Sequence, residues 1–252
     1  MIGKLAFVFV VCGLSVFLSF DVCAAESVGR ESIVYVSAHP DDLGGSAGTL
    51  MLLARKYEVY VVDYTHGERG LGDGGFKDGS TKAKRTAEEK AVCEALGLHL
   101  LWLDEVDGEA FAGRETCARL AEIYRRLRPR AIIAHWPLDT HGDHVMCSAA
   151  AMRAVALAGI APEVYFQFQS HQSRGFQTAY YVDVTAVAER KRKALSLYAC
   201  QDGPGMAERK RMVDAVHSAQ IGAGGAAEVF AILPGTIPAS GGVLDSLENS
   251  RR

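Results

Sequence analysis

Two short runs of imidazole and carboxylate side chains are the part of this sequence whose residue types and spacing suit chemistry. The first run is AHPDD at residues 38–42, and the second is HWPLDTHGDH at residues 135–144. Imidazole nitrogens and carboxylate oxygens suit Zn²⁺, and a catalytic zinc takes three protein ligands and keeps one position for water. Where two carboxylates are adjacent, one can bind the metal while its neighbour takes a proton from the attacking water. Together the two runs predict a metal-dependent hydrolytic site.

The positions of these runs strengthen that prediction. Taken alone, an Asp-Asp pair usually marks a solvated loop, and a His-x-x-His spacing is a weak metal signal. Here each run directly follows a short apolar segment, IVYVSA at residues 33–38 or RAIIAH at residues 130–135. In open α/β sheets, binding sites form outside the carboxyl ends of the strands. We therefore expect both runs to lie on one edge of one sheet.

Strand-like and helix-like segments alternate along the chain. We expect strands at residues 33–38, 58–65, 98–103, 130–135, 164–168 and 180–184, and helices at residues 47–56, 81–96, 115–128, 143–158, 185–200 and 206–220. Residues 67–80 are rich in Gly and Asp, which is typical of a loop. This alternation predicts a single α/β domain with a Rossmann-like, mostly parallel sheet and helices on both faces.

The two ends of the chain differ from this pattern. Lys4, the apolar residues 5–20 and the small residues up to Ala24 form the three-part pattern of a secretory signal peptide. An apolar stretch of about sixteen residues is short for a membrane span. We expect residues 1–24 to be removed and the protein to be exported, to the periplasm or outside the cell, without a stable membrane span. An uncleaved N-terminal anchor and a lipid on Cys23 are the alternatives.

Composition limits the remaining possibilities. The formal net charge of −3 argues against a nucleic-acid partner held by phosphate neutralisation.

Residues 235–252 are rich in Gly, Ser and Pro and are expected to be a mobile tail, so that residues 25–234 form the domain. Beyond the signal segment, the wide cysteine spacing favours buried thiols over disulfides or a cysteine metal site. These cysteines are Cys93, Cys117, Cys147 and Cys200.

The motifs AHPDD and HGDH resemble those of the PIG-L/LmbE deacetylase family. That family includes enzymes that remove the acetyl group from N-acetylglucosaminyl-phosphatidylinositol and from N-acetylglucosaminyl conjugates of bacterial thiol biosynthesis. Further segments are similar to the family pattern, so the resemblance covers about residues 33–230. These segments are THGERG at 65–70, RTAE at 85–88, ALG at 95–97, DG at 107–108, KAL at 193–195 and AEVF at 227–230.

Carried over position by position, the resemblance implies a set of roles. The implied ligands of the metal, Zn²⁺ or alternatively Fe²⁺, are His39, Asp42 and His144. Asp41 would be the general base, and a protonated His141 would stabilise the oxyanion. Asp143 would orient His141 through a hydrogen bond.

Four further residues are implied near the substrate. Arg85 and Asp107 match positions close to the sugar pocket. Glu68 and Arg69 would line its mouth, with a salt bridge inside the loop as the alternative. The chain departs from the family pattern at residues 43–45, LGG, where many members have an acidic residue, and at Gly142, where proline is common.

The expected function is therefore hydrolysis of an N-acetyl (acyl) group on an N-acetylglucosamine-type or other amino-sugar substrate, by a water that zinc activates and Asp41 deprotonates. The partner would be a small molecule or a glycan that carries an N-acetyl group. Two alternatives remain open. One is an exported carbohydrate-binding protein of the same fold without catalysis, and the other is a metal-dependent hydrolase of another amide or of an ester.

Overall fold

The computed structural model describes residues 29–247 and Ser250. The predicted signal peptide, residues 1–24, therefore lies outside the described residues. Within them the strands form one seven-stranded sheet in the order β3-β2-β1-β4-β5-β7-β6, in which β7 runs opposite to the other six strands. The strands are β1 (Ser32–Ser37), β2 (Glu58–Thr65), β3 (His99–Glu105), β4 (Ala131–His135), β5 (Glu163–Gln167), β6 (Tyr180–Asp183) and β7 (Ala227–Ile232). The predicted α/β fold with a mostly parallel sheet is confirmed.

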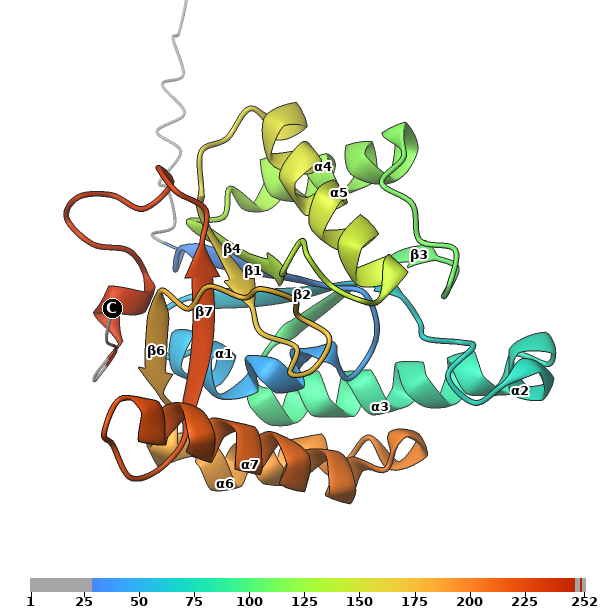
Figure 1. Ribbon diagram of the computed structural model, residues 1–252. Helices are drawn as coiled ribbons and strands as arrows, with labels where there is room; N and C mark the ends of the chain where they lie inside the picture. Colours follow the sequence, from blue (N-terminus) through green and yellow to red (C-terminus); the bar gives the residue numbers. More distant parts are fainter. Residues whose placement is uncertain (1–28, 248–249, 251–252) are drawn as a thin grey trace, which may run out of the picture.

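Helices cover both faces of the sheet. Figure 1 shows α4 and α5 on one side and α1, α3, α6 and α7 on the other. The helices are α1 (Ala47–Leu53), α2 (Asp73–Lys77), α3 (Ser80–Leu96), α4 (Arg114–Leu127), α5 (Gly142–Ala158), α6 (Ala188–Leu195) and α7 (Gly203–Gln220). Short 3₁₀ turns lie at η1 (Asp42–Gly45), η2 (Thr185–Val187), η3 (Ala199–Gln201) and η4 (Leu244–Ser246).

The central strand β1 shows why its sequence is an unbroken apolar run. Ile33 and Tyr35 belong to the core cluster that includes residues of α1, α3, α6 and α7. Val34 and Val36 belong to the cluster that includes residues of α4 and α5. Because successive strand residues point to opposite faces and both faces are covered, every residue of the strand is buried.

Three elements differ from the sequence-based expectation. Residues 73–77 form the short helix α2 inside the segment predicted to be a loop. The helix predicted over residues 185–200 is divided into η2, α6 and η3. Helix α7 begins at Gly203, three residues before the prediction, because the side chain of Asp202 accepts a hydrogen bond from the N–H of Gly205 and Pro204 stands in the first turn.

Part of the segment that was predicted to be a mobile tail from residue 235 packs against the core. Val243, Leu244 and Leu247 are buried and belong to the core. The segment is held by its backbone, since the N–H of Val243 donates to Oε2 of Glu163 at 2.6 Å. A Gly- and Pro-rich composition therefore did not prevent packing here.

The cysteines of the described region agree with the prediction of thiols. Cys93, Cys117 and Cys147 are buried and free, whereas Cys200 is free but only half-buried. Among residues 29–247, no helix is long and apolar enough to cross a membrane.

The sheet order brings the chemical residues together. Strands β3, β2, β1 and β4 are parallel neighbours, so the loops after their carboxyl ends meet on one edge. The first run follows β1, the THGERG segment follows β2, Asp107 follows β3 and the second run begins at the end of β4. The expectation that both runs share one edge is confirmed.

Candidate active site

The loop after β1 places two adjacent carboxylates differently. Asp41 has φ 91°, in the left-handed region that Asp tolerates better than most residues. Its N–H donates to Oε2 of Glu89 at 3.2 Å, and its carboxylate lies 3.1 Å from the guanidinium of Arg85. Both partners belong to α3. This helix therefore holds the backbone and the carboxylate of Asp41, while Asp42 turns into the cluster of histidines.

The three predicted metal ligands converge. Nδ1 of His39 lies 3.3 Å from Oδ2 of Asp42, and Nε2 of His144 lies 3.3 Å from Oδ1 of the same carboxylate. All three side chains are buried. His141 lies beside them, and donor atoms of His39, His141 and His144 are within 4.8 Å of one another.

A carboxylate stands behind each of the two histidine ligands. Nε2 of His39 donates to Oδ2 of Asp143 at 3.0 Å and lies 3.2 Å from Oδ1 of Asp107. Nδ1 of His144 lies 3.3 Å from Oδ1 of Asp139. The other ring nitrogens, Nδ1 of His39 and Nε2 of His144, face Asp42 and can bind a cation when it replaces a proton. Metal-binding histidines are typically held in this way, so the donor set fits a zinc-type cation.

Asp143 does not have the position that the sequence analysis assigned to it. Its carboxylate accepts hydrogen bonds from His39 and from the N–H groups of Gly108 (2.7 Å) and Ala110 (3.3 Å). Its own backbone N–H donates to Nδ1 of His141 at 3.3 Å. The side chain of Asp143 therefore orients His39, whereas only its backbone touches His141, which caps α5.

His135 belongs to the site but received no role from the sequence. It is fully buried and stacks on His144 with ring centroids 4.0 Å apart. Nε2 accepts the N–H of Ala38 at 3.0 Å and lies 3.3 Å from Oδ2 of Asp42. Asp42, His135 and His144 form a second potential donor group. Because Nε2 of His135 already accepts the N–H of Ala38, we interpret His135 as a residue that holds the loop after β1 and not as a metal ligand.

Two further residues of the site carried no sequence signal. Nε2 of Gln169 donates to the backbone oxygen of Asp42 at 2.8 Å and to Oδ1 at 3.1 Å. Nζ of Lys210, from α7, donates to Oε1 of Gln169 at 2.9 Å. Gln169 thus contacts Asp42 directly and Lys210 contacts Gln169, both from distant parts of the chain.

The electrostatics of the site favour a bound cation. Burial would raise the pKa of Asp42, but His144 and His135 hold it well below its usual range. Burial would lower the pKa of His144, yet Asp42 and Asp139 raise it to about 9. The carboxylates therefore draw a proton onto the imidazole in the absence of metal, and a cation can replace that proton.

The groups expected to do chemistry have different pKa values. Burial raises the pKa of Asp41 to about 6, against the opposing effect of Arg85. Burial lowers the pKa of His141, and His39 and His144 lower it further. Both effects favour the neutral imidazole of His141, whereas the sequence analysis expected a protonated one. Since its Nδ1 accepts the N–H of Asp143, its ring proton is on Nε2.

These groups open into a cleft of about 510 Å³. Three of the four predicted substrate residues, Arg69, Arg85 and Asp107, line it. Glu68 is not among the lining residues and is buried, and Arg69 pairs with Glu109 instead of Glu68. The remaining lining residues are His39, Asp41, Asp42, Gly70, Gly108, His141, His144, Gln172 and Gln201.

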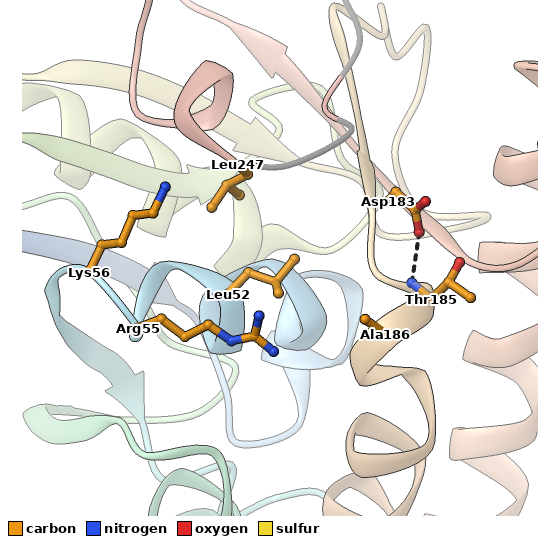
Figure 2. Close-up of a pocket in the computed structure, with 7 residues that line it drawn as sticks. All are labelled: Leu52, Arg55, Lys56, Asp183, Thr185, Ala186 and Leu247. Carbon is orange, nitrogen blue, oxygen red and sulfur yellow. Dashed lines mark hydrogen bonds between the residues drawn. The ribbon is translucent and has the colours of Figure 1, made fainter.

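A second cavity of about 430 Å³ lies between the end of α1 and the segment after β6 (Figure 2). Two of its three charged groups have partners within the fold: Lys56 donates to the backbone oxygen of Ser246, and Asp183 accepts the N–H of Thr185 at 2.8 Å. None of the predicted site residues lines this cavity. The cleft at the carboxyl edge of the sheet is therefore the candidate active site.

Comparisons with known proteins relate the chain to a family and to individual relatives. A family model described as "PIG-L: GlcNAc-PI de-N-acetylase" matches residues 34–155, which include both motifs. A 4-oxalmesaconate hydratase of Pseudomonas putida is 29% identical over 194 residues, 69% of this chain and 75% of that protein. A 1D-myo-inositol 2-acetamido-2-deoxy-alpha-D-glucopyranoside deacetylase of Kineococcus radiotolerans is 31% identical over 164 residues, 50% of this chain and 45% of that protein.

A solved structure matches the fold over most of its length. The N,N'-diacetylchitobiose deacetylase of Pyrococcus horikoshii superposes with a TM-score of 0.71 and 24% identity, over 82% of this chain and 85% of that protein. At this identity the match supports the architecture alone.

Proposed function

Since the chain belongs to the PIG-L family, we propose that it is a metal-dependent hydrolase that removes the N-acetyl group from an amino sugar. The observation that carries the proposal is the convergence of His39, Asp42 and His144, with the carboxylate of Asp41 beside them in an open cleft. This arrangement supplies the metal ligands and the general base that amide hydrolysis needs.

His39, Asp42 and His144 would hold the metal, Zn²⁺ or Fe²⁺. When bound, the metal supplies Lewis acidity and lowers the pKa of water from about 16 towards about 7. Asp41 accepts the proton of the attacking water and hands it to the leaving nitrogen. A pKa of about 6 suits both steps, because Asp41 is mostly ionised at neutral pH and yet basic enough to accept a proton.

His141 would act at the carbonyl oxygen of the substrate. Its ring proton is on Nε2, so the imidazole can donate a hydrogen bond to the oxygen as negative charge develops there. Loss of one such donor typically costs about 10²–10³ in rate. Asp143 contributes through His39, whose free nitrogen it directs towards Asp42.

The walls of the cleft suit a neutral, hydroxyl-rich substrate. Gln172 and Gln201 present amide groups. Arg85 is already engaged by Asp41 and by the backbone oxygens of Pro40 and Gly67. Arg69 donates to the backbone oxygen of Asp107 and stacks on a phenylalanine. These amides can pair with sugar hydroxyls, whereas both arginines have partners before any substrate binds.

We further propose that the protein acts outside the cytoplasm. The support is the signal-peptide pattern of residues 1–24. The substrate would then be a glycan of the cell envelope or of the surroundings.

The test is acetate release from N-acetylglucosamine and its short oligomers, with added Zn²⁺ and with a chelator. We expect release that depends on metal and that Asp41→Ala abolishes while the variant still binds metal. No release by a protein that binds stoichiometric zinc would reject the deacetylase proposal for these sugars. Strong activity of Asp41→Ala would reject Asp41 as the base.

The hydratase relative supports a second candidate, addition of water to the double bond of an unsaturated acid. A panel of such acids, followed by loss of their ultraviolet absorbance, separates the two reactions. Acetyl esters in the same panel test for an esterase. Sugar binding without turnover would instead favour a carbohydrate-binding protein.

A further inference from the structure

A chain of two side chains connects α7 to the predicted metal ligand Asp42. Lys210 donates from Nζ to Oε1 of Gln169 at 2.9 Å. Gln169 donates from Nε2 to Oδ1 of Asp42 at 3.1 Å and to the backbone oxygen of Asp42 at 2.8 Å. Gln169 is 4% exposed, so water does not readily replace either bond. In Figure 1, α7 lies along the lower face, beneath the layer that contains α1.

Simple chemistry determines which way the amide of Gln169 points. An ammonium group carries donors only, so Lys210 must face the oxygen of the amide. The NH₂ group must then face Asp42, whose oxygens can only accept. Lys210 thereby orients the donor that Asp42 requires.

The carboxylate of Asp42 is held from both sides as a result. Oδ1 accepts from Gln169, and Oδ2 accepts the N–H of His39 at 2.9 Å. With one donor on each oxygen, rotation of the carboxylate about its Cβ–Cγ bond breaks a buried hydrogen bond. Such groups orient a ligand before the metal arrives, which reduces the cost of binding.

The two glycines after Asp42 make room for this arrangement. A Cβ on Gly44 would lie 3.3 Å from Cε of Lys210. A Cβ on Gly45 would lie 2.8 Å from the backbone oxygen of Phe168 and 3.5 Å from Oε1 of Gln169. A side chain at residue 45 would push away the segment after β5 that carries Gln169. Gly44 and Gly45, within the LGG sequence that departs from the family pattern, thus have a structural reason.

We propose that Lys210 and Gln169 are positioning residues for the metal site, which together fix the carboxylate of Asp42 for cation binding. The inference rests on the metal site of the proposed function, but not on the identity of its substrate. Lys210 acts through Gln169, and neither residue touches the reacting atoms.

The test is zinc affinity, measured on the purified full chain by competition with a chromophoric chelator. We expect Gln169→Leu and Lys210→Met each to weaken binding about 10- to 100-fold, as for other partners of metal ligands. Because Lys210 acts through Gln169, the double variant should lose less than the product of the two single losses. The visible spectrum of the Co²⁺-loaded protein should change in Gln169→Leu.

Matched controls are Lys193→Met and Gln177→Leu. Lys193 is an exposed lysine of α6, and Gln177 is exposed on the loop before β6. Both should bind zinc as the unaltered protein does. Thermal melting of the metal-free variants monitors folding. If Gln169→Leu fails to fold, zinc affinity is compared for Lys210→Met alone, since Lys210 is only half-buried.

Unchanged zinc affinity in a folded Lys210→Met or Gln169→Leu variant would overturn the inference. A double variant whose loss of zinc affinity equals the product of the two single losses would also overturn it, because the two residues would then act independently. These readouts need no turnover. A protein that binds zinc tightly but releases no acetate therefore rejects the deacetylase proposal and leaves the positioning test intact.

Discussion

His39 and Asp143, 104 residues apart in sequence, are joined by a hydrogen bond of 3.0 Å from Nε2 of the imidazole to Oδ2 of the carboxylate. The bond fixes which nitrogen of His39 carries the proton and which faces Asp42. Two backbone N–H groups, of Gly108 and Ala110, hold the carboxylate in place. The loop after β3 therefore helps to position a ligand that follows β1.

Asp143→Asn should weaken zinc affinity about 10- to 100-fold. The amide of asparagine replaces one acceptor oxygen by a donor and removes the charge that favours the N–H of His39. A zinc competition titration measures the effect. The control is Asp183→Asn, which alters a carboxylate in the other cavity. If turnover falls while zinc affinity stays constant, Asp143 acts on His141 instead, as the sequence suggested.

Glu89→Leu should lower kcat about 10²-fold, the order expected for a misplaced catalytic group, and leave KM and zinc affinity almost unchanged. Glu89 is fully buried and accepts both the N–H of Asp41 and the hydroxyl of Tyr198 at 2.6 Å. Without it, the left-handed backbone of Asp41 loses its acceptor. Glu89→Gln keeps an oxygen for that N–H and should retain most of the turnover.

Steady-state kinetics on these two variants provide the measurement, and Glu94→Leu, an exposed position on the same helix, is the control. Equal losses in Glu89→Leu and Glu89→Gln would contradict a role through the backbone of Asp41.

Asp214 should make stability depend on pH. It lies in a buried cluster where Nζ of Lys191 donates to Asp214 at 2.5 Å and to Glu228 at 2.7 Å. Burial raises the pKa of Asp214 from its ordinary value of 3.8 to about 6, although Lys191 opposes the increase. The native state therefore binds this proton more tightly than the unfolded chain does. Its contribution to stability falls as pH rises from about 4 to about 6.

Asparagine at residue 214 does not titrate, so the melting temperature of the unaltered protein relative to Asp214→Asn should decrease as pH rises from about 4 to about 7. Thermal melts across this range measure the difference. Glu115→Gln, at an exposed position of α4, should show no such trend. A difference that is constant with pH would show that the ionisation of Asp214 is not coupled to folding.

Metal removal should lower the melting temperature. A cation that binds only the native state stabilises it by about 2.7 kcal/mol at 100 times its dissociation constant. Melting with Zn²⁺ and with excess chelator measures this effect. His144→Ala should abolish the response, whereas His171→Ala, which alters an exposed histidine, should retain it. A zinc response that survives in His144→Ala would remove this residue from the ligand set.

The layers of the fold and the edge on which the site forms follow from the residue pattern alone. Apolar runs such as residues 33–38 and 130–135 specify buried parallel strands, because a strand covered on both faces has no polar side. Since parallel strands end on a common edge, the donors that follow β1 and β4 had to meet. Which of these donors would hold the metal, His39, Asp42 and His144, was implied by the resemblance to the PIG-L family and not by local patterns alone.

The side chains that support the predicted ligands became visible only in the folded chain. Asp143 contacts His39 rather than its neighbour His141, and Gln169 reaches Asp42 across 127 residues. Hydrogen-bond partners of this kind depend on the direction of each side chain and on the packing of distant elements, which residue type and spacing do not encode. The same reason explains residues 243–247, whose burial depends on a surface that the rest of the fold provides.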